Sequence, residues 1–111
     1  MQPTNALRFA EFLLHRLDVD LGERSYPILI GLGCLGAGAS YDGLPQGTVA
    51  AVVTNEVVAP LYLERLHTVL RQRHREVVKI VLPDGEAHKD WASLDRIFDA
   101  LLAHGCDRKT V

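Results

Sequence analysis

Hydrophobic residues in the second half of the chain follow two alternating patterns. Continuous apolar runs at 48–54 (TVAAVVT) and 76–83 (EVVKIVLP) are typical of strands buried on both faces. After each run, apolar residues recur at helical spacing, from Val57 to about Leu70 and from Trp91 to about Leu102. Strands joined by helices are parallel, and their carboxyl ends lie along one edge of the sheet. The pattern therefore predicts parallel strand–helix–strand–helix structure over 48–104.

The first half of the chain has a different pattern. LDVDL alternates apolar and acidic residues, GERS is a turn, and YPILI is apolar and β-branched, which together predict a β-hairpin. Charged residues interrupt the segment before it, so 1–16 lacks the apolar stretch of a signal peptide. We expect 1–16 to be an N-terminal extension, either disordered or an amphipathic helix capped by Thr4 or Asn5. Residues 17–111 then form the first part of an α/β domain.

Glycines after the hairpin have the spacing of a dinucleotide-binding fingerprint, Gly31-x-Gly33-x-x-Gly36. That fingerprint requires a helix to follow, but 36–47 contains four glycines and Pro45. We therefore predict that these glycines form a turn and bind no pyrophosphate.

Composition and charge narrow the class of protein. With 111 residues, 48% of them hydrophobic, and a formal charge of -2, the chain fits a small α/β domain and has no basic stripe for nucleic acid or membrane lipid. Cys34 and Cys106 form no Cys-x-x-Cys pair, which favours a reducing cytoplasm. RKTV at 108–111 resembles the start of another strand. Overall we predict a Rossmann-like partial domain whose unpaired sheet edges leave it marginally stable or oligomeric, for example as a homodimer.

Polar residues follow both predicted parallel strands. Thr54-Asn55-Glu56 ends the first strand, and Asp84-Gly85-Glu86 with Lys89 follows the second. Ligands of open parallel sheets bind at this edge, where Asn55 offers a donor and an acceptor and Glu86 can accept from paired ribose hydroxyls. The alternative is purely structural, because acidic residues and a glycine are also ordinary helix-start signals.

Other chemistry finds little support in the sequence. The five histidines show no metal-ligand spacing, and only His88 lies within a polar loop. Neither a Gly-x-Ser-x-Gly elbow nor a P-loop is present. Trp91 and Phe98 share a stripe with leucines, so we expect them in the core. We predict no catalytic residue and no metal ligand in this chain.

Four segments, LGERSYPILIG, VVTNEVVAPLYLERL, VLPDGEAHK and CDRKT, together resemble 3-dehydroquinate synthase over 17–111. The resemblance implies an N-terminal NAD-binding domain, here ending before the family's glycine-rich loop. It also implies conversion of a sugar phosphate, 3-deoxy-arabino-heptulosonate 7-phosphate, to 3-dehydroquinate and phosphate in the shikimate pathway of aromatic amino acid biosynthesis. NAD supplies the hydride chemistry in that family, and zinc or cobalt is bound by residues that this sequence lacks.

Carried over by position, the resemblance places Asp84, Gly85, Glu86 and Lys89 in the NAD site, with Glu86 and Lys89 at the adenosine ribose. Asn55 would lie near the same end of the cofactor. Ala87 and His88 are included as neighbours in the same loop.

Two alternatives remain open from the sequence. The chain could be a segment of the related metal-dependent polyol and alcohol dehydrogenases, which also use NAD, or a non-catalytic truncated α/β fragment. The LPDGE loop and the GERSYPI hairpin favour the synthase. We expect the 111-residue chain by itself to be inactive.

Overall fold

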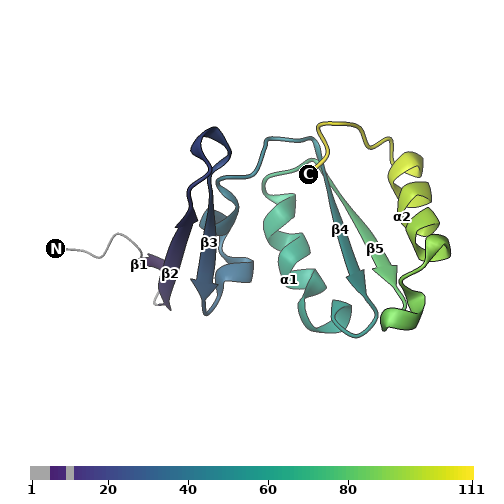
Figure 1. The fold of residues 1–111 in the computed structure, drawn as a ribbon, viewed down its shortest axis with the longest axis horizontal. Coiled ribbons are helices and arrows are strands. Elements are labelled where there is room, and N and C mark those ends of the chain that lie inside the picture. The colour runs from purple at the N-terminus through teal and green to yellow at the C-terminus, as the bar shows by residue number, and fades with distance from the viewer. Residues whose placement is uncertain (1–5, 10–11) are drawn as a thin grey trace. The chain divides into compact units, whose positions relative to one another are not determined.

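The computed structural model describes residues 6–9 and 12–111. It divides into two compact units, 1–43 and 44–111. Figure 1 labels the elements along the chain.

The first unit is a three-stranded antiparallel sheet of β1 (Ala6–Phe9), β2 (Phe12–Val19) and β3 (Tyr26–Gly31), with β2 in the centre. The predicted hairpin is confirmed, with Val19 opposite Tyr26. Its turn is the 3-10 helix η1 (Gly22–Arg24), where Gly22 adopts a φ of +66°. The Ser25 hydroxyl accepts a hydrogen bond from Leu21 N–H at 2.8 Å and stabilises this turn.

The helix expected within 1–16 is wrong for the described part of that segment. Residues 6–9 and 12–16 form strands, because β2 pairs with β3 through residues as early as Leu14. That pairing satisfies more backbone groups than a short isolated helix could, and it overrides the helical spacing. A boundary after Arg16 would cut β2. The proposed N-caps Thr4 and Asn5 lie outside the described residues.

Short turns follow the hairpin, as the glycine content predicts. Gly33 has a φ of +76° before the 3-10 helix η2 (Cys34–Gly36), and a second such turn, η3, spans Gly38–Tyr41. No α-helix begins there in the described chain, so the context of a dinucleotide-binding fingerprint is missing.

The second unit confirms the parallel arrangement. β4 (Val49–Asn55), α1 (Ala59–Arg71), β5 (Glu76–Leu82) and α2 (Trp91–Ala103) follow one another, and β4 pairs in parallel with β5 from Val49↔Glu76 to Asn55↔Leu82. Pro60 lies in the first turn of α1, where its missing N–H costs nothing. α2 ends with Gly105 at a φ of +66°.

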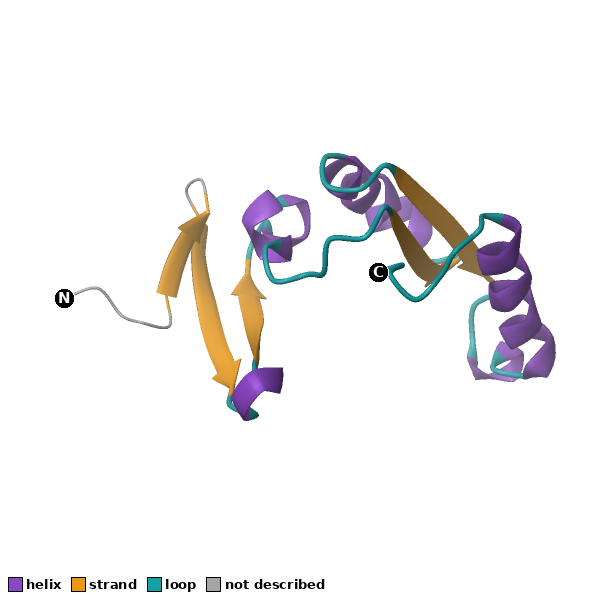
Figure 2. Cartoon of the chain, turned by 90° about the horizontal axis from the view of Figure 1, so that it is seen from above, coloured by secondary structure: helices purple, strands orange, loops and turns teal. Residues whose placement is uncertain are grey.

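The two helices cover opposite sides of the β4–β5 pair, as Figures 1 and 2 show. The last residue, Val111, is hydrogen-bonded to β4 on the edge away from β5. The crossover through α1 leads from β4 to β5, and the crossover through α2 leads back across β4. The right-handed rule for such crossovers predicts that this reversal places the two helices on opposite faces.

The core of the second unit lies between the sheet and these helices. Its buried apolar side chains are Ala50, Leu63, Val69, Leu70, Val78 and Ile80. The expected burial of Trp91 and Phe98 is wrong for this chain, since they are 82% and 50% exposed. The α2 stripe is wider than two strands can cover, so one side of it remains in solvent.

Candidate functional site

An open pocket of about 580 Å³ lies at the carboxyl ends of β4 and β5. Its lining consists of the last strand residues and the loop that follows β5: Val53, Thr54, Asn55, Leu82, Pro83, Asp84, Gly85, Glu86, His88 and Lys89. The strand pairing brings Asn55 directly opposite Leu82. Two polar clusters that are separate in sequence therefore line one pocket.

Asn55 connects this pocket to the start of α1. Its side-chain Oδ1 accepts hydrogen bonds from the backbone N–H groups of Val57 at 3.0 Å and Val58 at 2.8 Å. These N–H groups precede the helix and have no partner within it. Because Oδ1 is occupied, only the Asn55 amide group remains as a donor for a ligand.

Glu56 joins the two loops at the rim. Its backbone N–H donates to Leu82 O at 2.9 Å, and its carboxylate accepts a long hydrogen bond of 3.4 Å from Asp84 N–H. The loop after β5 is therefore attached to the loop after β4 through one residue. Gly85 follows with a φ of +103°, a conformation that side chains rarely adopt.

Glu86 and Lys89 form an ion pair on this loop. Lys89 Nζ lies 2.8 Å from Glu86 Oε1 across the short 3-10 helix η4 (Glu86–His88), and both side chains are largely exposed. The hydrogen bond and charge of Glu86 raise the pKa of Lys89 above its ordinary value. The pair presents carboxylate oxygens and an ammonium group to the same pocket, so it can offer an acceptor and a donor to a hydroxylated ligand.

Asp90 defines where α2 begins. Its carboxylate accepts a hydrogen bond of 2.9 Å from Ser93 N–H, the usual N-cap arrangement. That bond is the main reason why the pKa of Asp90 lies below its ordinary value. The N-cap fixes the helix immediately after Lys89 and thereby limits how far the loop can move.

Six of the seven predicted site residues line this pocket, and Ala87 does not. Sequence reasoning missed the apolar floor formed by Val53, Leu82 and Pro83. A signal for it exists, since these residues end the two apolar runs, but such residues are equally typical of a core.

Metal chemistry has no support in the described part of the chain. There, no group of three or more His, Cys, Asp or Glu side chains could hold a metal ion. The described helices include none long and apolar enough to cross a membrane.

Comparisons with curated proteins identify the relatives of this chain, although no protein-family model matches it. The 3-dehydroquinate synthase of Azotobacter vinelandii is 54% identical over 97 residues, which cover 87% of this chain and 26% of that enzyme. Two 3-dehydroquinate synthases from strains of Pseudomonas aeruginosa are 55% and 54% identical over the same length, with the same coverage. The chain thus spans about a quarter of the length of the curated relatives it matches.

Solved structures with a similar fold include 2-deoxy-scyllo-inosose synthase. One of its structures, described as complexed with carbaglucose-6-phosphate, NAD+ and Co2+, matches 86% of this chain and 26% of its own with a TM-score of 0.74. A second structure matches 86% and 27% with the same score. At 14% identity the likeness shows the fold alone. The sequence identities confirm that the chain is homologous to a segment of 3-dehydroquinate synthase.

Proposed function

We propose that this chain forms the first part of the NAD-binding domain of a 3-dehydroquinate synthase. The observation that carries the proposal is the 54–55% identity to three such enzymes over 97 residues. The complete enzyme would convert 3-deoxy-arabino-heptulosonate 7-phosphate to 3-dehydroquinate and phosphate. It would act in the cytoplasm, which agrees with the free thiols of Cys34 and Cys106.

The pocket at the ends of β4 and β5 supports this proposal, because it is lined by hydrogen-bond donors and acceptors that could bind the adenosine half of NAD. Glu86 would accept hydrogen bonds from the ribose hydroxyls, and Lys89 would donate to the same sugar. The Asn55 amide would donate at the facing side of the pocket, since its Oδ1 is already held by α1. Asp84, Gly85 and His88 would shape the loop around the ligand.

Bound NAD supplies hydride chemistry, and the residues of this chain would bind and orient it. Two acidic side chains and one lysine among the lining residues disfavour an additional phosphate, so we expect NAD to be preferred over NADP. The described residues offer no metal site, and we derive no step through a metal. Zinc or cobalt would be bound elsewhere in the complete enzyme.

A chimera tests the proposal. The chain would replace the matching segment of the Pseudomonas aeruginosa enzyme, and phosphate release from the heptulosonate phosphate would be measured against NADH formation from glycerol. We expect phosphate release without free NADH. NADH formation with glycerol would instead favour a dehydrogenase, and a folded chimera with neither activity would favour a non-catalytic fragment.

Variants within the chimera test the site. Glu86→Gln and Lys89→Met should each raise the KM for NAD about tenfold, the equivalent of one charged hydrogen bond. The matched controls are Glu64→Gln and Lys79→Met, which remove a similar exposed ion pair of 2.9 Å away from the pocket. An equal rise in the KM for NAD in the site variants and in the control variants would contradict the placement of Glu86 and Lys89 in the NAD site.

The isolated 111-residue chain is the last part of the proposal. We expect it neither to bind zinc nor to convert substrate, because its described residues hold no metal-ligand cluster and it spans about a quarter of the length of its relatives. Calorimetric titration that detects micromolar binding of both zinc and NAD would overturn this expectation.

A further inference from the structure

A second pocket, of about 520 Å³, lies at the opposite edge of the same sheet, where β4 and β5 begin. Two segments line it, one before β4 and one between α1 and β5: Leu44, Pro45, Gln46, Gly47, Thr48, Gln72, Arg73, His74 and Arg75. None of these residues carries a carboxylate, and two carry guanidinium groups. No part of the proposed NAD site contributes to it.

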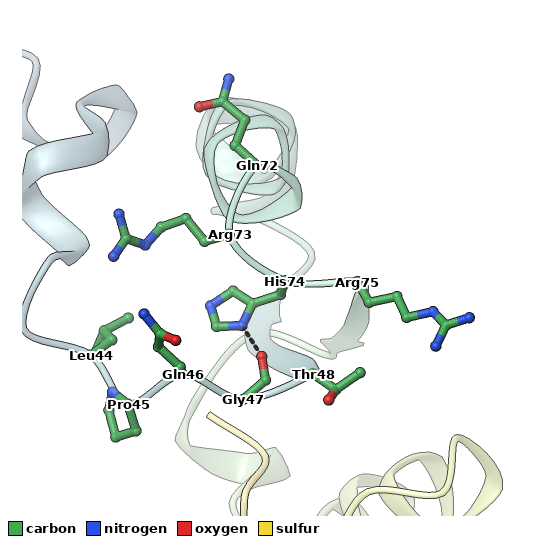
Figure 3. A pocket seen from close by; sticks show the side chains of 9 residues that line it. All are labelled: Leu44, Pro45, Gln46, Gly47, Thr48, Gln72, Arg73, His74 and Arg75. Carbon is green, nitrogen blue, oxygen red and sulfur yellow. Dashed lines mark hydrogen bonds between the residues drawn. The ribbon is translucent and has the colours of Figure 1, made fainter.

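His74 is the unusual residue in this pocket. It is only 5% exposed, and its Nδ1 lies 2.7 Å from Gly47 O (Figure 3). A carbonyl oxygen only accepts hydrogen bonds, so Nδ1 carries a proton in this contact. In the singly protonated tautomer that this contact selects, Nε2 is an acceptor. Nε2 is the one buried side-chain nitrogen or oxygen in the described residues without a hydrogen-bond partner.

Three backbone N–H groups close to His74 donate to other acceptors and do not serve Nε2. His74 N–H donates to Leu70 O at 2.9 Å, Arg75 N–H donates to Thr48 O at 2.9 Å, and Gly47 N–H donates to Pro45 O at 3.1 Å. Gly47 is further held by the close approach of Lys109 O. The ring is held at Nδ1 by Gly47 O, and Nε2 has no donor among the described residues, which leaves that position to a donor from outside the chain.

The neighbouring side chains indicate which other chemical groups a ligand of this pocket must have. Figure 3 shows the free ring nitrogen of His74 on the side where the Gln46 amide and the Arg73 guanidinium lie. Arg73 already makes an interaction of its own. Its guanidinium has five N–H donors, so it can serve a further acceptor at the same time. The site thus combines one acceptor, Nε2, with several donors.

We propose that this pocket binds a small oxyanion that carries its own O–H group, of the hydrogenphosphate class. The P–OH group donates to His74 Nε2, and the charged oxygens accept from Arg73 and the Gln46 amide. Sulfate carries no proton at neutral pH and lacks the donor that Nε2 needs. Phosphate monoesters lose theirs with a second pKa of about 6. The protonated oxyanion is therefore distinguished from other anions by a single hydrogen bond.

Nitrogen NMR of the histidine rings in the 111-residue chain tests the proposal. At about pH 8, where ordinary imidazoles are neutral, inorganic phosphate should shift the Nε2 resonance of His74 saturably and leave Nδ1 nearly unchanged. Sulfate at equal ionic strength and methyl phosphate should leave Nε2 unchanged. The arms of the titration thus separate free phosphate from a phosphate ester.

Matched variants complete the test. Gln46→Ala, which changes an exposed side chain, should raise the apparent dissociation constant for phosphate about threefold to tenfold. His104→Gln is the control, because His104 has the same Nδ1 contact to a backbone carbonyl, 2.8 Å from Ala100 O, but is exposed. Three results would overturn the proposal. The first is an equal shift of Nε2 with phosphate and with sulfate, and the second is no saturable shift of Nε2. The third is an unchanged phosphate affinity in both Gln46→Ala and Arg73→Gln.

Discussion

Val111 pairs with Val49 at the beginning of β4. Its N–H donates to Val49 O at 3.1 Å, and its carbonyl accepts from Ala51 N–H at 2.7 Å. β4 therefore has β5 on one edge and the returning chain on the other. In open α/β sheets, ligands bind at the carboxyl edge where the strand order reverses. Asn55, at the end of β4, lies beside that reversal.

Replacing Gly47 should destabilise the second unit. A Cβ at this position would lie 2.2 Å from Lys109 O, a backbone atom that cannot move without displacing the segment that leads to Val111. We expect Gly47→Ala to lower the free energy of unfolding by about 1–3 kcal/mol, measured by urea denaturation. Gly43→Ala is the control, since a Cβ there meets nothing within 4 Å. Similar results for both variants would contradict this account.

Asn55 has a structural role that can be separated from ligand binding. Asn55→Ala removes the acceptor of two N–H groups before α1 and should cost about 1 kcal/mol of unfolding free energy. Asn55→Asp keeps an oxygen at Oδ1 and should retain stability, but it lacks the amide donor. We therefore expect Asn55→Asp in the chimera to weaken NAD binding without lowering the melting temperature. Loss of stability in both variants would indicate that the amide group itself is structural.

Lys89 should respond to the removal of Glu86. The carboxylate raises the pKa of Lys89, so Glu86→Gln should return this pKa toward its ordinary value. Because the folded-state pKa is raised, the contribution of the pair to stability is present below the unfolded-state pKa and is lost as the pH rises through the folded-state pKa. NMR titration of the lysine side-chain carbons would measure the change. Glu64→Gln should leave the pKa of Lys89 unaltered.

Asp90 should make α2 sensitive to acid. Its pKa is lowered, chiefly by the hydrogen bond from Ser93 N–H, so its stabilising effect is present above the ordinary aspartate value and is lost as the pH falls through the folded-state value. Asp90→Ala should lower the melting temperature at neutral pH. The difference in melting temperature between Asp90→Ala and the unmodified chain should become smaller below about pH 4. Asp99→Ala, an exposed change on the same helix, should show no such narrowing.

The uncovered side of α2 should make the chain self-associate. Trp91 and Leu102 are 82% and 76% exposed, which is unusual for large apolar side chains on one helix. Sedimentation velocity should show association that increases with concentration. The double change Trp91→Ser and Leu102→Ser should weaken it, and Val57→Ser, at a residue 55% exposed outside α2, should not. A monomer at all concentrations would contradict the prediction.

Most of the second unit could be predicted from its sequence. Each of its segments keeps a single hydrophobic pattern along its whole length, either a continuous apolar run or helical spacing. The runs at 48–54 and 76–83 became β4 and β5 within one residue at either end. The first unit was harder. FLLHRL has helical spacing, yet it forms part of β2 because β3 supplies a pairing partner. Such long-range pairing leaves no mark in local periodicity.

The candidate site shows the same division. The polar residues at the strand ends could be placed in one pocket because parallel strands end at one edge. The use of Asn55 Oδ1 by α1 could not be predicted, since it depends on the loop conformation. His74 gave no signal at all. Its burial and its contact with Gly47 arise only when the segment before β4 meets the segment before β5.

The hydrogen-bonding of β4 also bears on the order in which the chain folds. The β2–β3 pairing from Val19↔Tyr26 closes across a short turn, so it can form within microseconds and as soon as both strands leave the ribosome. The β4–β5 pairing from Val49↔Glu76 needs the whole of α1 between its partners. The opposite edge of β4 is reached only after α2 and the segment up to Val111 have been made. Of the two described strands with a partner on each edge, β2 and β4, β4 is therefore the later to have both edges paired.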